Sequence, residues 1–327
     1  MSTRRNFLKT SALTVASAPF LFGQQERQRR PHWQMIANNE PVQAPKFKPN
    51  PNEWSNDTIT AAWIGHATVL INFFGTNIIT DPVFSERIGL NVANLFTIGP
   101  KRLVYPAMVF EELPRIDLIL LSHAHFDHLD TPTLRKFDRS VPIVVAKNTL
   151  DVVEDLEFEK THELDWGQSA QIGELRVEAL EAKHFGWRYP WEKDRSRGDW
   201  DGRSYNSYLV SKNGRHFVFG GDTAFHEHFR QLGERDLFID LAILPIGAYD
   251  PWIENHCNPE QAFEMMNHMN AKYMLPIHWN TFIQGEEPVP EPMERLKNAA
   301  PAERIALEHI GQTWAMSSAI VEQHACP

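Results

Sequence analysis

Asp117-Leu-Ile-Leu-Leu-Ser122 runs directly into His123-Ala124-His125-Phe126-Asp127-His128, and these twelve residues say more about the chain than any other segment. The first half is an apolar run with the length of a buried strand. The second half places four metal-binding side chains within six residues, which an apolar core does not require. The segment therefore predicts a strand that carries a metal site at its end. A solvated loop rich in histidine and aspartate is the alternative interpretation.

Three further metal-binding side chains stand at the ends of apolar, strand-like runs. His184 follows the run 177–183, Asp222 follows 217–221, and His278 follows 273–277. A single histidine in such a place is more often an ordinary surface or core residue. Three of these positions behind one strong motif favour a shared site, because strand ends can aim side chains at one point.

The order of predicted elements indicates an α/β fold. Strands are predicted at 58–63, 68–73, 77–80, 117–122, 141–146, 175–182, 205–211, 215–219, 241–246 and 272–277, and helices at 132–137, 148–156, 225–232, 259–270 and 292–299. Strands outnumber helices, and most helices fall singly between strands. This order predicts one domain, 58–327, in which two sheets pack between outer helices and the strand-end loops carry the site.

The N-terminus has the pattern of an export signal. Arg4-Arg5 lies in the segment 3–9, ahead of a mildly apolar stretch that is short for a membrane span. Residues 1–23 are therefore predicted to be a twin-arginine signal, read by that export machinery, and the protein is expected in the periplasm. A disordered basic tail is the alternative. Pro19 follows the small residues 16–18, so an uncleaved signal that holds the protein at the membrane stays open.

Residues 24–57 are rich in Gln, Arg, Asn and Pro and are predicted to be a linker that wraps the surface or stays loose. The formal net charge of −10 argues against a nucleic-acid partner, since phosphate binding needs a basic surface. The cysteines are Cys257 and Cys326, and a disulfide between them is allowed but not implied. The sequence leaves the oligomeric state open.

Several short motifs together resemble the metallo-β-lactamase-fold hydrolases, in the branch that includes N-acyl-phosphatidylethanolamine-hydrolysing phospholipase D and related bacterial hydrolases. The matching segments are Trp63-Ile-Gly-His-Ala-Thr68, 80–84, 123–128, 220–222, 244–249 and 277–279. The resemblance spans about residues 58 to 310 and implies a four-layer αββα sandwich. It also implies two divalent metal ions, which are expected to be zinc, with manganese or iron as alternatives, and a metal-bridging hydroxide as the nucleophile.

Carried over position by position, the resemblance implies seven metal ligands. They are His123, His125 and His184 for one ion, Asp127, His128 and His278 for the other, and Asp222 as a bridge between them. Asp127 also counts as a catalytic residue. The chemistry agrees, since each set of three ligands leaves a coordination position open for a nucleophile or substrate.

Three further residues are expected close to the ligands. Asp81 would orient a ligand histidine by a hydrogen bond, or else form an Asx turn before Pro82. His66, in a Gly-His-x-Thr element, would lie beside the site or hold its hairpin together. His256 resembles a histidine of the phospholipase branch and is a candidate proton donor to the leaving group.

The segment 185–203 directly follows His184 and interleaves aromatic side chains with arginines. It predicts a lid for a small-molecule or lipid-like substrate, with Trp187, Arg195, Arg197 and, from elsewhere in the chain, Tyr249 as substrate contacts. The alternative is a solvated insert whose own acidic residues pair with the arginines. This segment departs from the phospholipase pattern, so lipid specificity does not carry over from the resemblance.

The leading hypothesis is an exported dinuclear phosphodiesterase similar to a phospholipase D. Hydrolysis of a lactone, ester or amide at the same centre is the alternative, followed by an iron-dependent oxygenase and a metal-stabilised binding protein. Di-iron reductases usually have a carboxylate where this chain has His125, and they carry a flavin domain that the chain has no room for. A serine hydrolase is disfavoured because the sequence lacks a Gly-x-Ser-x-Gly element.

Overall fold

The computed structural model describes residues 40–92 and 96–316. The predicted signal, the linker up to residue 39 and Cys326 therefore lie outside the described residues. Residues 40–57 run over the surface of the domain, where Gln43 pairs with Val104 and the ring of Phe47 stacks on His309. Every helix in the described part of the chain is too short or too polar to cross a bilayer.

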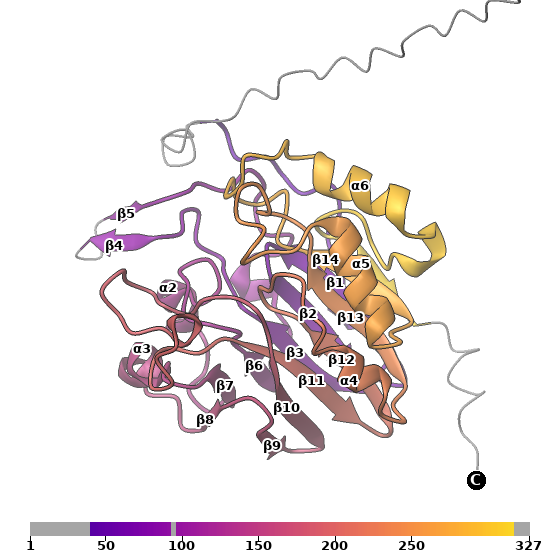
Figure 1. Cartoon of the computed structure of the whole chain (residues 1–327), viewed down its shortest axis with the longest axis horizontal. Helices are drawn as coiled ribbons and strands as arrows, with labels where there is room; N and C mark the ends of the chain where they lie inside the picture. The colour runs from indigo at the N-terminus through magenta and orange to yellow at the C-terminus, as the bar shows by residue number, and fades with distance from the viewer. Residues whose placement is uncertain (1–39, 93–95, 317–327) are drawn as a thin grey trace, which may run out of the picture.

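Two mixed β-sheets form the centre of the domain (Figure 1). In spatial order, the first sheet contains β15 (Thr313–Ala315), β1 (Ile59–Gly65), β2 (Thr68–Phe73), β3 (Thr76–Thr80), β6 (Leu118–Leu120), β7 (Ile143–Ala146) and β8 (Thr161–Leu164). The second contains β14 (Tyr273–Ile277), β13 (Ile239–Pro245), β12 (Arg215–Phe219), β11 (Asn206–Lys212), β10 (Leu175–Glu181) and β9 (Ser169–Ile172). A separate hairpin pairs β4 (Leu90–Val92) with β5 (Phe96–Ile98).

Helices flank the two sheets. They are α2 (Thr131–Leu134), α3 (Leu150–Val153), α4 (Arg230–Gly233), α5 (Pro259–His268) and α6 (Glu291–Ala299), with short 3₁₀ turns at Pro51–Glu53, Phe110–Glu112, Glu154–Leu156, Arg195–Arg197 and Ala302–Arg304. Helix α5 packs on β13, and α4 and α6 pack beside α5 (Figure 1). The start of α5 is fixed by Asn258, whose side chain accepts the N–H of Gln261 while Pro259 takes the first helical position.

The central strands are apolar along their whole length because both of their faces are covered. Every residue of β1, β2 and β13 is buried. The two sheets meet face to face, and Phe73 of β2 contacts Phe217 of β12 edge to face at 5.1 Å between ring centroids. This packing confirms the predicted sandwich of two sheets between outer helices.

Each predicted strand and helix overlaps an observed element, although the helix predicted at 132–137 ends at Leu134 and the one predicted at 225–232 begins only at Arg230. The ring Nδ1 of His226 accepts the N–H of His228, and this local hydrogen bond competes with a helical turn. The sequence analysis missed β4, β5, β8, β9 and β15. The last three are short edge or near-edge strands whose residues are mostly half-buried or exposed, so they lack a clear apolar pattern.

Candidate metal centre

The predicted ligands come from both sheets and meet at one end of the sandwich. His123 to His128 follow β6 of the first sheet, whereas His184, Asp222 and His278 follow β10, β12 and β14 of the second. Three non-glycine residues around the centre have a positive φ, namely His66 (55°), Asp81 (31°) and His278 (62°). A positive φ is uncommon for any residue other than glycine and persists where the surrounding structure imposes it. The N–H of His278 donates to the carbonyl of His66 at 3.1 Å, which joins the two sheets here.

Gly221 allows β12 to end close to the histidine motif. It has a φ of 58°, and a Cβ at this position would lie 2.5 Å from the Cβ of Ser122. A side chain would therefore push the Asp222 turn away from the ligands of the first sheet.

The first group of side chains consists of His123, His125 and His184. The Nε2 atom of His123 lies 2.8 Å from Nδ1 of His125, which lies 3.3 Å from Nε2 of His184. These three ring nitrogens converge within 4.8 Å of one another, so the three histidines could hold one metal ion. Burial is the main cause that lowers the pKa of each of them, to about 4 for His125, and keeps the rings neutral at pH 7.

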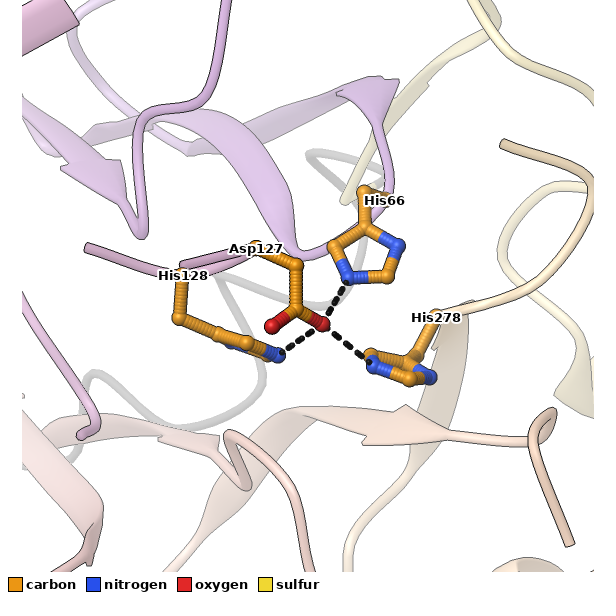
Figure 2. A group of neighbouring side chains, drawn as sticks. All are labelled: His66, Asp127, His128 and His278. Atoms are coloured by element: carbon orange, nitrogen blue, oxygen red, sulfur yellow. Dashed lines mark hydrogen bonds and ion pairs between the residues drawn. The ribbon is translucent and has the colours of Figure 1, made fainter. Parts of the chain in front are cut away.

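The second group contains Asp127, His128 and His278, together with His66 (Figure 2). The Oδ2 atom of Asp127 lies 3.3 Å from Nε2 of His128 and 3.4 Å from Nε2 of His278. His66, whose ring lies beside that of His278, approaches the same oxygen with its Nε2 at 2.9 Å. Figure 2 shows all three rings turned toward this carboxylate.

Asp222 lies between the two groups. Its Oδ2 atom is 3.0 Å from Nε2 of both His128 and His278, and 3.9 Å from Nε2 of His184. Although burial alone would raise it, neighbouring His128 holds the pKa of Asp222 well below its usual range, and Asp222 is therefore ionised. A single carboxylate thus faces both sets of histidines, the position that the sequence analysis expected of a bridging ligand.

Asp81 and Ser122 orient two of the predicted ligands. Asp81 is completely buried, and its Oδ2 accepts hydrogen bonds from Nδ1 of His128 and from Oγ of Ser122, both at 2.6 Å. The Ser122 hydroxyl in turn lies 2.8 Å from Nδ1 of His123. This arrangement holds a proton on Nδ1 of each histidine and directs Nε2 toward the site. The sequence analysis anticipated Asp81 but not Ser122.

Other outer contacts hold His184 and Asp127. Nδ1 of His184 lies 2.8 Å from the carbonyl of Asn255 and donates to it. The side-chain amide of Gln284 donates to Oδ2 of Asp127 at 2.7 Å. Because burial lowers the pKa of His66 to about 3, this ring is neutral and donates its Nε2 proton to Asp127. The sequence analysis missed Gln284, since it stands in a loop without any motif.

The donor set fits two divalent ions. Neutral imidazoles and carboxylates are the ligands that zinc and similar metals prefer. Oδ1 of Asp222 is buried and has no hydrogen-bond partner among the described residues. Buried polar atoms normally have partners, and a metal ion would provide one. The buried His and Asp clusters are therefore consistent with a dinuclear metal centre.

His256 also lies at the centre. Its Nε2 is 3.3 Å from Oδ2 of Asp222, and its ring is 5.0 Å from that of His184 between centroids. The residue is 9% exposed and therefore largely buried. Cys257 next to it is buried, and its thiol donates to the carbonyl of Pro245.

Of the four predicted substrate contacts, Trp187 has a ring contact with the predicted ligand His125. Its ring is 6.1 Å from that of His125 and 5.2 Å from that of Phe185, and the guanidinium of Arg197 lies over it at 5.8 Å. Arg195 instead pairs with Asp165 and lies 3.6 Å above the ring of Trp166. The hydroxyl of Tyr249 donates to Glu291 at 3.0 Å. The polar groups of Arg195 and Tyr249 are therefore already bonded to other side chains of the protein, Asp165 and Glu291.

The segment 185–203 is bonded to itself and to the domain. Arg203 pairs with Glu192 and Asp151, both at 2.7 Å. Buried Arg188 donates to the carbonyls of Ala124, at 2.6 Å, and Leu129, at 3.0 Å, on either side of the ligands Asp127 and His128. The pair Arg203–Glu192 matches the alternative interpretation, in which acidic residues of the segment itself pair with its arginines, whereas Arg195 pairs with Asp165 outside the segment. Arg188 also fastens the segment to the metal-binding loop, which the sequence did not indicate.

Comparisons with known proteins agree with this geometry. A sequence model of the beta-lactamase superfamily domain matches residues 76–279. An uncharacterized protein of Mycobacterium tuberculosis is 33% identical over 291 residues, which cover 84% of this chain and 74% of that protein. N-acyl-phosphatidylethanolamine-hydrolyzing phospholipase D 1 of Caenorhabditis elegans is 33% identical over 260 residues, or 74% of this chain and 70% of the worm protein.

Among solved structures, an isothiocyanate hydrolase from Delia radicum gut bacteria has the same fold. The TM-score is 0.63 at 15% identity, over 79% of this chain and 99% of that one. The family match, the shared fold and the buried His and Asp clusters lead to one conclusion. The chain belongs to the metallo-β-lactamase superfamily and is a metal-dependent hydrolase.

Proposed function

We propose that this hydrolase is a dinuclear phosphodiesterase that acts on a lipid-like diester after export. The observation that carries the proposal is the position of Asp222, whose single oxygen Oδ2 faces both groups of histidines. The relative in Caenorhabditis elegans, a phospholipase D by name, supports a phosphodiester as the substrate class.

Each side chain of the centre has a distinct role in this proposal. His123, His125 and His184 would hold one ion, Asp127, His128 and His278 the other, and Asp222 would contact both. When bound, the two ions, which we propose to be zinc, would supply Lewis acidity and lower the pKa of a water molecule toward neutrality. Asp81 and Ser122 fix the rings of His128 and His123, so that their Nε2 lone pairs are aimed before substrate arrives.

His256 is placed to act on the leaving group. It lies outside the predicted ligand positions, and its Nε2 is held 3.3 Å from Asp222. A proton on this nitrogen could be donated to the alkoxide that departs when the P–O bond breaks. We expect His256→Gln to lower kcat about a hundredfold or more, with little change in metal content.

An aromatic rim suits an apolar part of the substrate. The ring of Phe185 lies 4.4 Å from that of His125, and Trp187 continues the rim outward. Such side chains exclude water from one side of the centre and can pack against an acyl chain. Arg197, whose guanidinium lies over Trp187, is the best placed of the predicted arginines to meet a phosphate.

Metal analysis joined to a substrate panel tests the proposed reaction. The full chain, exported through its own signal, should contain two metal ions and should hydrolyse bis(p-nitrophenyl) phosphate. Asp222→Asn should lose this activity while remaining folded. Turnover of lactones with none of any phosphodiester would contradict the substrate class, and one iron with oxygen uptake would contradict the hydrolase centre.

Export is a separate part of the proposal, based on Arg4-Arg5 and the apolar segment behind them. Replacing both arginines with lysine should keep the protein in the cytoplasm, whereas the unchanged chain should be recovered from the periplasm. Equal recovery of the two proteins from the periplasm would refute export by the twin-arginine route.

A further inference from the structure

The β4–β5 hairpin presents an apolar face without a covering partner among the described residues. Leu90 lies directly opposite Ile98, and Phe96 is two residues from Ile98, so these three side chains point to one side of the hairpin. Leu90 is 46% exposed, Ile98 is 49% exposed and Phe96 is 57% exposed. Figure 1 shows the hairpin projecting from the edge of the body, away from the two large sheets.

The shape of this hairpin is specified at its base. Gly89 and Gly99 have φ angles of 130° and 154°, and a Cβ on either would lie 2.2 Å or less from a carbonyl oxygen of the opposite strand. The two strands can therefore approach this closely only with glycine at both positions. These two glycines therefore fix the backbone conformation at the base of the hairpin.

Charge is arranged along the hairpin in a distinctive way. The sequence from 88 to 100 contains no charged residue. At the base of the hairpin, the backbones of Arg87 and Lys101 form an antiparallel bridge. Lys101 lies 3.3 Å from Glu86 and is 17% exposed in its side chain. The apolar end thus stands above a base that carries two cations and the one anion Glu86, and this order matches the depth profile of a lipid surface, where anionic headgroups lie above the acyl chains.

The base of the hairpin also adjoins the metal centre. Ile88 packs with Val83 and Phe282 in a small buried cluster. The ring of Phe282 contacts His66 edge to face at 5.2 Å, and His66 bonds the ligand Asp127. A surface that holds the hairpin would therefore lie close to the centre.

We propose that Leu90, Phe96 and Ile98 form a membrane-docking face that inserts into an anionic lipid surface. A second copy of the chain is a less suitable occupant, because three side chains expose only a few hundred Å² and a stable dimer buries roughly 800 Å² on each partner. Aromatic and aliphatic side chains on a narrow projection can bury this area in lipid without a complementary protein surface. Docking on a membrane is a property separate from the proposed reaction. It can be measured as vesicle binding, in an assay that needs no turnover.

The first test places a reporter on the hairpin itself. Phe96→Cys in a Cys326→Ser background is labelled with an environment-sensitive fluorophore and mixed with vesicles of phosphatidylcholine containing about 30% phosphatidylglycerol. The emission should shift to the blue on vesicle addition. The same label at Leu150, a 41% exposed residue on α3, should not shift. This readout is independent of any anchoring by the N-terminus.

The second test removes the apolar face from the full chain. The triple variant Leu90→Ser, Phe96→Ser, Ile98→Ser should bind the same vesicles about tenfold or more weakly, while Leu150→Ser binds like the unchanged chain. Turnover of bis(p-nitrophenyl) phosphate in solution should stay the same in both variants, so that loss of docking is distinguished from loss of the reaction. The proposal is overturned if the label at residue 96 does not shift, if the triple variant binds vesicles undiminished, or if the unchanged chain self-associates and this variant becomes monomeric.

Discussion

In the proposed dinuclear centre, replacing Asp81 with asparagine should weaken the binding of one metal ion far more than that of the other. Asp81 accepts hydrogen bonds at 2.6 Å from Nδ1 of His128 and from Oγ of Ser122, and all of these atoms are buried. Both of these donors bond the same oxygen, whereas the other oxygen, Oδ1, accepts the N–H of Ser122 at 2.8 Å. An amide keeps only one acceptor oxygen, so its NH2 group would face either the N–H of Ser122 or Nδ1 of His128. In either orientation the negative charge that holds the Nδ1 proton of His128 is lost, and Nε2 is less firmly directed at the second ion.

The magnitude follows from the hydrogen bond that is lost. A hydrogen bond to a charged, buried group contributes about 1.5–3 kcal/mol, and removal of an outer contact of a metal ligand typically costs about ten- to a hundredfold in affinity. We therefore expect the ion held by Asp127, His128 and His278 to bind about ten- to a hundredfold more weakly. The ion held by the first group of histidines should change little, because Asp81 reaches His123 only through Ser122.

The assay is a titration of metal-free protein with zinc in competition with a chromophoric chelator, which resolves two binding steps. Asp117→Asn is the matched control, since this carboxylate lies just before β6 and accepts the N–H of Asn77 at 3.0 Å. Circular dichroism of the metal-free proteins checks that both variants fold. Two binding steps with unchanged affinities in Asp81→Asn would refute the role assigned to Asp81.

Three further predictions concern other parts of the domain. Asp222→Asn should lower kcat about a thousandfold or more and leave the circular dichroism spectrum unchanged. Activity close to that of the unchanged chain would exclude a reaction that depends on this carboxylate. Arg188→Met should reduce the free energy of unfolding by about 2–4 kcal/mol in urea, because two buried carbonyls lose a charged donor, whereas Arg197→Met should be nearly neutral. Burial lowers the pKa of His226 to about 3, below the value of 6.5 in the unfolded chain, so the unfolded chain binds more protons between these values. Stability should therefore fall as pH drops below 6.5, by up to about 1.4 kcal/mol per pH unit from this residue. His226→Gln should flatten the profile of thermal midpoint against pH relative to exposed His228→Gln, and parallel profiles would contradict the assignment.

The sequence was most informative where side chains and strand ends coincide. The motif 123–128 predicted its own site because strand, turn and ligands are contiguous in the chain. His184, Asp222 and His278 could be added because each directly follows an apolar strand, and strand ends of a sandwich converge. Asp81 and His66 were placed beside the site by short motifs, and the structure finds both in contact with predicted ligands.

Contacts that depend on tertiary packing were beyond the sequence. Gln284 reaches Asp127 across 157 positions of the chain, and no local pattern indicates such a pair. Arg195 and Tyr249 had the right chemistry for a substrate, but Asp165 and Glu291 engage their polar groups. The β4–β5 hairpin escaped notice because its side chains are apolar without being buried, and periodicity identifies strands mainly through burial.

The meeting of both sheets at the metal centre has a consequence for how the fold is held together. His128 and His278 stand 150 positions apart, and one ion bound to both would close a loop of that length in the manner of a cross-link. Closing a loop of about this size removes on the order of 5 kcal/mol of conformational entropy from the unfolded chain, by analogy with a disulfide. Metal supply would then govern the lifetime of the folded chain as well as its chemistry, so a chelator should expose it to proteases long before any site residue is altered.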